Sequence, residues 1–195
     1  MRILNTKIDT KSFFRKGVKP LNEEFGVFLV CGYMGSGKTY QTIYEVENNF
    51  TSRKVKTNIL SYHSNKHEIE GCGIIREMVQ DYSSHKIFII DEMNKIFPKD
   101  SKIDKDFYNW LQHSRKCSRY VFMIYQEYIN VPTWLRGVAN RVYTTRKYPF
   151  GILKTDLGIP YLDDQKEWQV DTISSKIYKR NKCITDLYDT LEVIK

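Results

Sequence analysis

The chain has 195 residues, of which 41% are apolar and 28% charged, and its formal net charge is +8. This length fits one domain of ordinary size, and the composition excludes a disordered chain. No apolar run reaches the roughly 18 residues that a membrane-spanning helix needs, and the N-terminus lacks the apolar stretch of a secretory signal. The positive charge favours a polyanionic partner, either nucleic acid or an anionic membrane face.

The first half of the chain contains the clearest strand signals. Met1–Glu24 is polar and basic, and we expect it to form an N-terminal arm packed onto a single domain of residues 25–195. The run Gly26–Cys31 is short, apolar and rich in β-branched residues, which predicts a buried strand. A glycine-rich loop and a helix over Thr39–Asn48 should follow. Alternation in Lys54–Leu60 predicts a second strand.

The rest of the chain continues to alternate between strand and helix patterns. Residues 61–73 are polar and turn-rich, and residues 151–195 form a tail with strand-like pieces at 168–173. The other predicted elements, in chain order, are a helix over 74–82, a buried strand over 86–91, a helix over 103–116, a strand over 120–125, a helical turn over 132–138 and a strand over 141–145. This order predicts an α/β fold in three layers, with a mostly parallel central sheet and helices on both faces.

The most informative motif is the loop Gly32–Thr39, which fits the pattern G-x-x-x-x-G-K-[ST] completely. In such a loop the backbone N–H groups point inward at a phosphate, Lys38 supplies a positive charge and the Thr39 hydroxyl ligates Mg²⁺. The sequence therefore predicts ATP with Mg²⁺ as the ligand, in preference to a glycine-rich turn without nucleotide. The remaining residues expected to bind the nucleotide are Gly32, Gly35, Ser36 and Gly37.

A second motif ends the apolar strand over 86–91. Asp91 stands at its carboxyl end and would hold Mg²⁺ together with Thr39. Glu92 follows directly and would orient or deprotonate the attacking water. The alternative is a strand that ends in two solvated acids, but the preceding phosphate-binding loop favours the catalytic interpretation.

Other polar residues follow the later strands. Gln126 comes after the strand over 120–125 and is predicted to sense the γ-phosphate or its water; the alternative is a loop glutamine without a role. An arginine that reaches a neighbouring subunit's γ-phosphate is also expected, because ATPase rings use such a group. Arg141 and Arg136 are the preferred candidates, although most arginines in this region would be surface charges or DNA contacts.

At this point the sequence resembles the Zot family, which comprises zonula occludens toxin and the gene I assembly proteins of filamentous phages. The resemblance covers about residues 26–150 and rests on short segments in a fixed order. After Gly32–Thr39 these segments are Lys56-Thr57-Asn58-Ile59, Ile89-Ile90-Asp91-Glu92, His113-Ser114-Arg115-Lys116, Tyr125-Gln126, Leu135-Arg136 and Arg141-Val142-Tyr143, with Leu187-Tyr188-Asp189-Thr190 near the end.

The resemblance implies a P-loop NTPase of the RecA-like, FtsK/HerA type, the group that includes viral genome-packaging motors. It implies an ATP hydrolase that packages or extrudes viral or phage DNA as a homo-oligomeric ring, binding DNA without sequence preference. Family members commonly carry a membrane span after this domain, and this sequence lacks one, so we expect a motor in the host cytoplasm or associated with the virion, with a viral assembly or membrane partner. The alternatives are a slow-cycling ATP-binding assembly factor of a phage export complex and a small nucleotide kinase.

Overall fold

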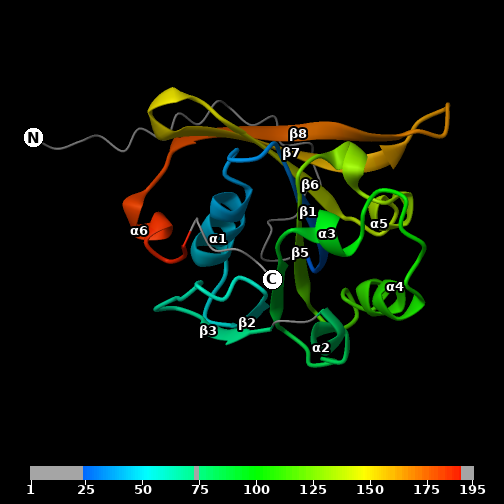
Figure 1. Cartoon of the computed structure of the whole chain (residues 1–195), viewed down its shortest axis with the longest axis horizontal. Helices are drawn as coiled ribbons and strands as arrows, with labels where there is room; N and C mark the ends of the chain where they lie inside the picture. The colour runs from blue at the N-terminus through cyan, green and yellow to red at the C-terminus, as the bar shows by residue number, and fades with distance from the viewer. Residues whose placement is uncertain (1–23, 73–74, 190–195) are drawn as a thin grey trace, which may run out of the picture.

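A computed structural model describes residues 24–72 and 75–189 (Figure 1). Of the expected N-terminal arm, only Glu24 lies within the described residues. The strands form one eight-stranded sheet in the order β3-β2-β4-β5-β1-β6-β7-β8. They are β1 (Gly26–Cys31), β2 (Lys54–Thr57), β3 (Glu68–Gly71), β4 (Ile87–Ile90), β5 (Tyr120–Tyr125), β6 (Arg141–Lys147), β7 (Ile152–Leu162) and β8 (Trp168–Lys179). The α-helices are α1 (Lys38–Asn49), α2 (Ile75–Val79), α3 (Met93–Ile96), α4 (Lys105–Gln112), α5 (Thr133–Arg136) and α6 (Lys182–Thr185).

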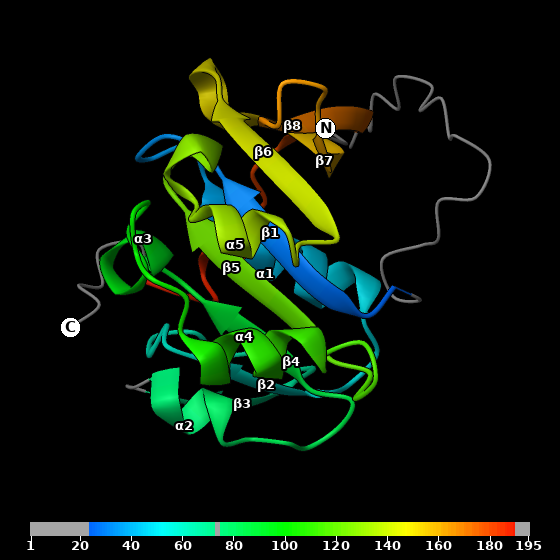
Figure 2. The ribbon, with the colours of Figure 1, turned by 90° about the vertical axis from the view of Figure 1, so that its right-hand side faces the viewer.

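The centre of the sheet is made of β4, β5 and β1, in which every residue is buried. These strands run parallel, with β5 paired to β4 on one side and to β1 on the other (Figure 2). Strands covered on both faces read as continuous apolar runs, which is why the sequence signal for them is strong. Because the strands are parallel, their carboxyl ends all reach the same edge of the sheet.

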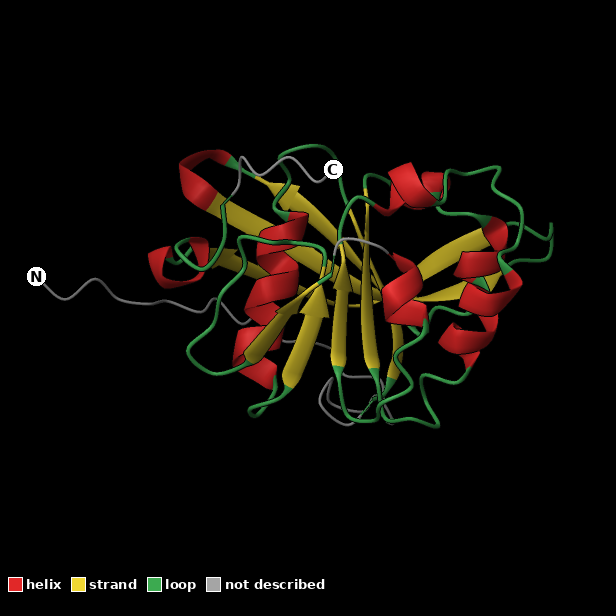
Figure 3. Cartoon of the chain, turned by 60° about the horizontal axis from the view of Figure 1, so that its bottom comes forward, coloured by secondary structure: helices red, strands yellow, loops and turns green. Residues whose placement is uncertain are grey.

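Helices cover both faces of the sheet (Figures 1 and 3). On one face, α1 and α6 pack through a cluster that includes Tyr40, Ile43 and Phe122. On the other, α2 to α5 pack through a cluster that includes Trp110 and Met123. The three-layer α/β fold with a mostly parallel sheet is thereby confirmed. None of the helices in the described ranges has the length and apolar character needed to span a membrane.

The strands β2 and β3, at one edge of the sheet, differ from the strands that the sequence predicts. The turn-rich segment 61–73 contains β3, a short edge strand with exposed polar side chains that carries no apolar signal. The strand expected over 54–60 ends at Thr57, because the Thr57 hydroxyl accepts a hydrogen bond from the Ile59 N–H at 3.1 Å and starts a turn.

The tail holds the largest departure from the expected fold. Strand-like character was expected at 168–173, but the structure contains a long antiparallel hairpin, with β7 paired to both β6 and β8. This hairpin is tied to α1 by buried polar groups. The Thr155 hydroxyl donates to Gln41 Oε1 at 3.0 Å, and Gln41 Nε2 donates to Glu45 Oε1 at 2.8 Å. The rings of Tyr44 and Tyr178 stack nearby, with centroids 4.9 Å apart.

We expect Thr155→Val to lower the free energy of unfolding by about 1–3 kcal/mol. The substitution keeps the side-chain shape but leaves the buried Gln41 Oε1 without its donor. Thr172→Val is the matched control, since Thr172 lies exposed on β8. Removal of its hydroxyl should change the free energy of unfolding by less than about 0.5 kcal/mol. Urea unfolding measures both, and equal stability of Thr155→Val and the parent would contradict the assignment of this link.

Candidate active site

The loop Gly32–Thr39 joins β1 to α1 and is held tightly by neighbouring strands. A Cβ on Gly32 would lie 2.4 Å from Ser36 Oγ and 2.6 Å from the backbone oxygen of Thr145, so only glycine fits there. The Gly32 N–H donates to the backbone oxygen of Gln126 at 2.8 Å. Ser36 Oγ and Thr145 Oγ1 are 3.0 Å apart and share a hydrogen bond. These contacts to the ends of β5 and β6 fix the shape of the loop.

The amino end of α1 faces the space that this loop encloses. Gly37 precedes the helix with φ = 92°, a conformation that glycine adopts without strain, and no side chain caps the first turn. The uncapped N–H groups and the helix dipole favour a bound anion. Lys38 Nζ donates to the Tyr33 carbonyl at 3.0 Å. Burial lowers the pKa of Lys38, and the nearby Asp91 charge opposes that change. A phosphate would add a second negative partner for this ammonium.

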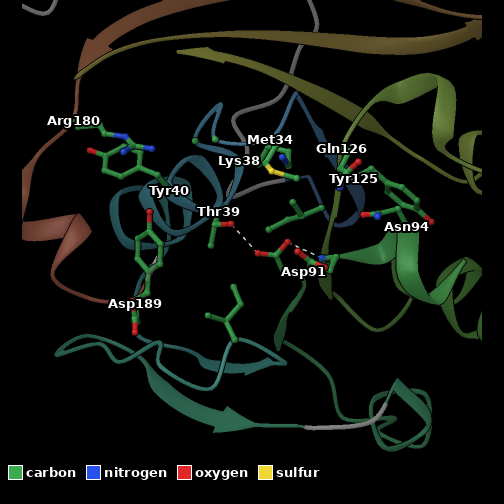
Figure 4. Close-up of a pocket in the computed structure, with 16 residues that line it drawn as sticks. Met34, Lys38, Thr39, Tyr40, Asp91, Asn94, Tyr125, Gln126, Arg180 and Asp189 are labelled. Atoms are coloured by element: carbon green, nitrogen blue, oxygen red, sulfur yellow. Dashed lines mark hydrogen bonds between the residues drawn. The ribbon is translucent and has the colours of Figure 1, made fainter. Parts of the chain in front are cut away.

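Thr39 and Asp91 meet across the same space, although they lie 52 positions apart in the sequence. Thr39 Oγ1 donates to Asp91 Oδ2 at 2.8 Å (Figure 4). Burial raises the pKa of Asp91, and the hydrogen bond from Thr39 opposes that rise. A hydroxyl and a carboxylate oxygen at this separation are the hard ligands that Mg²⁺ prefers, so the residues present fit a magnesium ion.

Asn58 holds Asp91 in place, a role that the sequence motif did not reveal. The Asp91 N–H donates to Asn58 Oδ1 at 2.8 Å, and Asn58 Nδ2 donates to the Asp91 carbonyl at 3.0 Å. Asn58 follows β2, which pairs with β4, so the two residues end neighbouring strands. The paired hydrogen bonds orient the backbone of Asp91, and with it the carboxylate.

Glu92 and Gln126 line the same cavity, which has a volume of about 240 Å³. Glu92 has φ = 55°, an uncommon conformation for a residue with a side chain, and forms an ion pair with Lys95 of α3. Gln126 follows β5, which separates β4 from β1. The strand order therefore places Gln126 between the phosphate-binding loop and the Asp91–Glu92 pair. Asn94 and Arg180, which sequence analysis did not single out, also line this cavity.

The two arginines predicted to act across a subunit interface, Arg141 and Arg136, differ in burial and in hydrogen-bond partners. Arg141 begins β6 in register with Phe28, and its side chain is buried and paired with Glu24, with Nη2 2.6 Å from Oε2. It therefore lies at the end of β6 away from the phosphate-binding loop. Arg136 is half-buried on α5, where Nε donates to the Val131 carbonyl and Nη2 to the Ile129 carbonyl, each at 2.8 Å. Neither lines the cavity, and of the two, Arg136 is the less enclosed.

The loop, the helix that follows it and the carboxylate opposite Thr39 together define a P-loop nucleotide-binding protein. Residues 26–192 match the family described as Zonular occludens toxin (Zot). This match covers most of the chain, and the chain belongs to the Zot family. The family resemblance drawn from short motifs is thereby confirmed.

Solved structures share the fold. The N-terminal domain of zonular occludens toxin from Neisseria meningitidis superposes with a TM-score of 0.56 at 21% identity, covering 84% of this chain and 98% of that one. The genome packaging NTPase B204 from Sulfolobus turreted icosahedral virus 2, in complex with ATP-gammaS, gives a TM-score of 0.51 at 12% identity, covering 80% of this chain and 100% of that one. A comparison with curated proteins found no match. At these identities the likeness shows a shared fold.

We expect Lys38→Ala to weaken ATP binding roughly 100-fold or more, because a phosphate would lose a charged hydrogen-bond donor inside a partly buried site. Lys54→Ala is a suitable control, since it removes the same charge from the exposed start of β2. Isothermal titration of both variants with ATP and Mg²⁺ provides the measurement. If Lys38→Ala binds ATP as tightly as the parent, this loop is not the phosphate site.

Proposed function

We propose that this protein is an ATP hydrolase that acts as a motor for packaging or extruding viral or phage DNA. The observation that carries the proposal is the convergence of Lys38, Thr39, Asp91, Glu92 and Gln126 on one cavity at the carboxyl edge of parallel strands. Membership of the Zot family and the shared fold with a viral genome-packaging NTPase support the DNA-handling role.

In the proposed hydrolysis, the protein side chains position the nucleotide and the water and form no covalent bond to the phosphate. Lys38 and the N–H groups of the loop bind the phosphates, and Thr39 and Asp91 hold Mg²⁺. When bound there, Mg²⁺ would neutralise negative charge that develops on the phosphates during transfer. Glu92 accepts a proton from the attacking water or orients it, and Gln126 contacts that water or the γ-phosphate. Positioning and electrostatic stabilisation supply most of the rate enhancement.

DNA is the proposed partner because the charge and its distribution suit a polyanion. The net charge is +8, and exposed basic side chains occur on β6, on β8 and in the turn between β7 and β8. These exposed basic residues are Arg146, Lys147, Lys166, Lys176 and Lys179. Lysine and arginine contacts to phosphates carry no sequence information, so we expect binding without sequence preference. The motor would work in the host cell or with the virion, alongside a viral assembly or membrane partner.

A ring is proposed because apolar side chains lie exposed beside the phosphate-binding loop. Tyr33 and Met34 are 71% and 86% exposed, and with Tyr148, at 45%, they line a second hollow next to the loop. Exposed apolar patches commonly mark protein interfaces. An interface at this position would bring a neighbour's arginine toward the nucleotide, and Arg136, the less enclosed of the two candidates, is the proposed donor.

DNA should stimulate ATP hydrolysis, and affinity for DNA should fall steeply between roughly 50 and 200 mM salt, because bound phosphates release counterions. Two DNA duplexes of unrelated sequence should bind equally. Lys38→Ala serves as the control, since it should still bind DNA but show no stimulated hydrolysis. A flat salt response would contradict the DNA interface. Slow hydrolysis that DNA leaves unchanged would instead favour an assembly factor, and turnover only with a phosphate acceptor would favour a kinase.

A subunit-mixing experiment tests the ring. Glu92→Gln should bind ATP without turnover, because an amide keeps the shape but cannot act as a base. Arg136→Ala should lose roughly 10³-fold in rate if its guanidinium acts across an interface. Mixing the two inactive variants creates interfaces that pair an intact Glu92 with an intact Arg136, and activity should partly return. Co-assembly without any recovery would rule out Arg136 as the group acting in trans.

A further inference from the structure

Arg180 is a cavity residue for which the proposed mechanism gives no role. It directly follows β8, at the end of the antiparallel hairpin, and lines the same cavity as Lys38, Thr39 and Asp91. The phosphate-binding loop and the acidic pair come from the parallel part of the sheet. Arg180 is thus a cation that the added hairpin contributes to the site.

The structure holds Arg180 in a defined position. The backbone N–H of Arg180 donates to the Gly151 carbonyl at 2.9 Å, and the backbone N–H of Asn181 donates to Tyr40 Oη at 2.8 Å. The guanidinium carbon lies 5.5 Å from the centroid of the Tyr40 ring, which is fully buried. A guanidinium over an aromatic face gains a favourable cation–π interaction. The backbone on both sides and the ring beneath therefore orient this side chain before any ligand binds.

The guanidinium also lies against the phosphate-binding loop, and it has hydrogen-bond donors that are still available for a ligand. Nη2 is 3.2 Å from the position that a Cβ on Gly37 would take. Nε is buried and has no hydrogen-bond partner, and no carboxylate among the described residues forms an ion pair with Arg180. A buried charged donor without a partner is costly, and an anion in the cavity would satisfy it.

The position of Arg180 indicates which part of a nucleotide it meets. Figure 4 shows Arg180 and Tyr40 at one end of the cavity and Asn94 and Gln126 at the other, with Thr39 and Asp91 between them. The γ-phosphate belongs at the Gln126 end, because Gln126 is the group proposed to contact the attacking water or the γ-phosphate, and the metal-binding pair lies next to it. The opposite end is then the place for the α-phosphate and the nucleoside.

We propose that Arg180 binds the α-phosphate of the nucleotide within its own subunit, stacked on Tyr40. This inference rests on the proposed nucleotide site and adds a second cation to it. Lys38 serves the terminal phosphates, whereas Arg180 serves the part of the ligand that hydrolysis leaves unchanged. ADP and ATP should therefore depend on Arg180 equally, unlike a group that senses the γ-phosphate.

The test compares affinities for ATP, ADP and pyrophosphate, each with Mg²⁺, in the parent, Arg180→Ala and Arg180→Met. Both variants should bind ADP and ATP about 10- to 100-fold more weakly, by a common factor, since each loses one charged hydrogen-bond donor. Pyrophosphate, which lacks the nucleoside end, should bind with unchanged affinity. In steady-state hydrolysis, KM should rise while kcat stays within about threefold of the parent. Lys182→Ala removes the same charge from an exposed position two residues along the chain, outside the cavity lining, and should change none of these values.

Arg180→Met guards against a loss of folding, because methionine keeps an apolar stem over Tyr40 while the charge is removed. Thermal unfolding without nucleotide reports on that packing separately. Unchanged ADP affinity in Arg180→Met would overturn the inference, as would an equal loss for pyrophosphate or a fall confined to kcat. A parent protein that binds neither ATP nor ADP would instead overturn the proposed function itself.

Discussion

The hydrogen bond between Thr39 and Asp91 is the contact on which the rest of the site depends. It requires two residues far apart in sequence to reach one edge of the sheet, and parallel pairing of β4, β5 and β1 is what brings them there. A buried carboxylate is costly unless it is hydrogen-bonded, and the Thr39 hydroxyl supplies one such bond. Asn58, which follows β2, binds the Asp91 backbone through its N–H and carbonyl, so a fourth strand end helps to set the geometry of the proposed metal site.

The strand order fits the hydrolysis proposed for this edge of the sheet. With β5 between β1 and β4, the loop and the acidic pair are separated by the width of one strand, and the end of that strand carries Gln126. Strands lie about 4.8 Å apart, so the gap between the two motifs leaves room for a phosphate and a water. The Gly32 N–H, bound to the Gln126 carbonyl, locks this spacing.

Sequence reasoning identified the features that depend on local pattern. The loop Gly32–Thr39 and the strand before Asp91 have signatures that no long-range contact alters, and both were located correctly. The edge strand β3 and the hairpin of β7 and β8 were missed or only partly seen, because their side chains alternate irregularly between buried and exposed. Asn58 and Arg180 could not be assigned roles, since each acts through a neighbour distant in sequence. Arg141 likewise gave no sign of its pairing with Glu24.

The hairpin of β7 and β8 connects to the parallel part of the fold through its contacts with α1. Thr155 contacts the first turn of α1 at Gln41, and Arg180 lies over Tyr40 in the same turn. Both contacts fall on the helix whose amino end faces the cavity, so a shift of the hairpin relative to α1 changes the position of a cation at the site. The exposed lysines at positions 176 and 179 lie on the same hairpin. The proposed DNA-binding side chains and the nucleotide cavity therefore share one structural element, the hairpin, whose buried contacts to α1 lie next to the phosphate-binding loop.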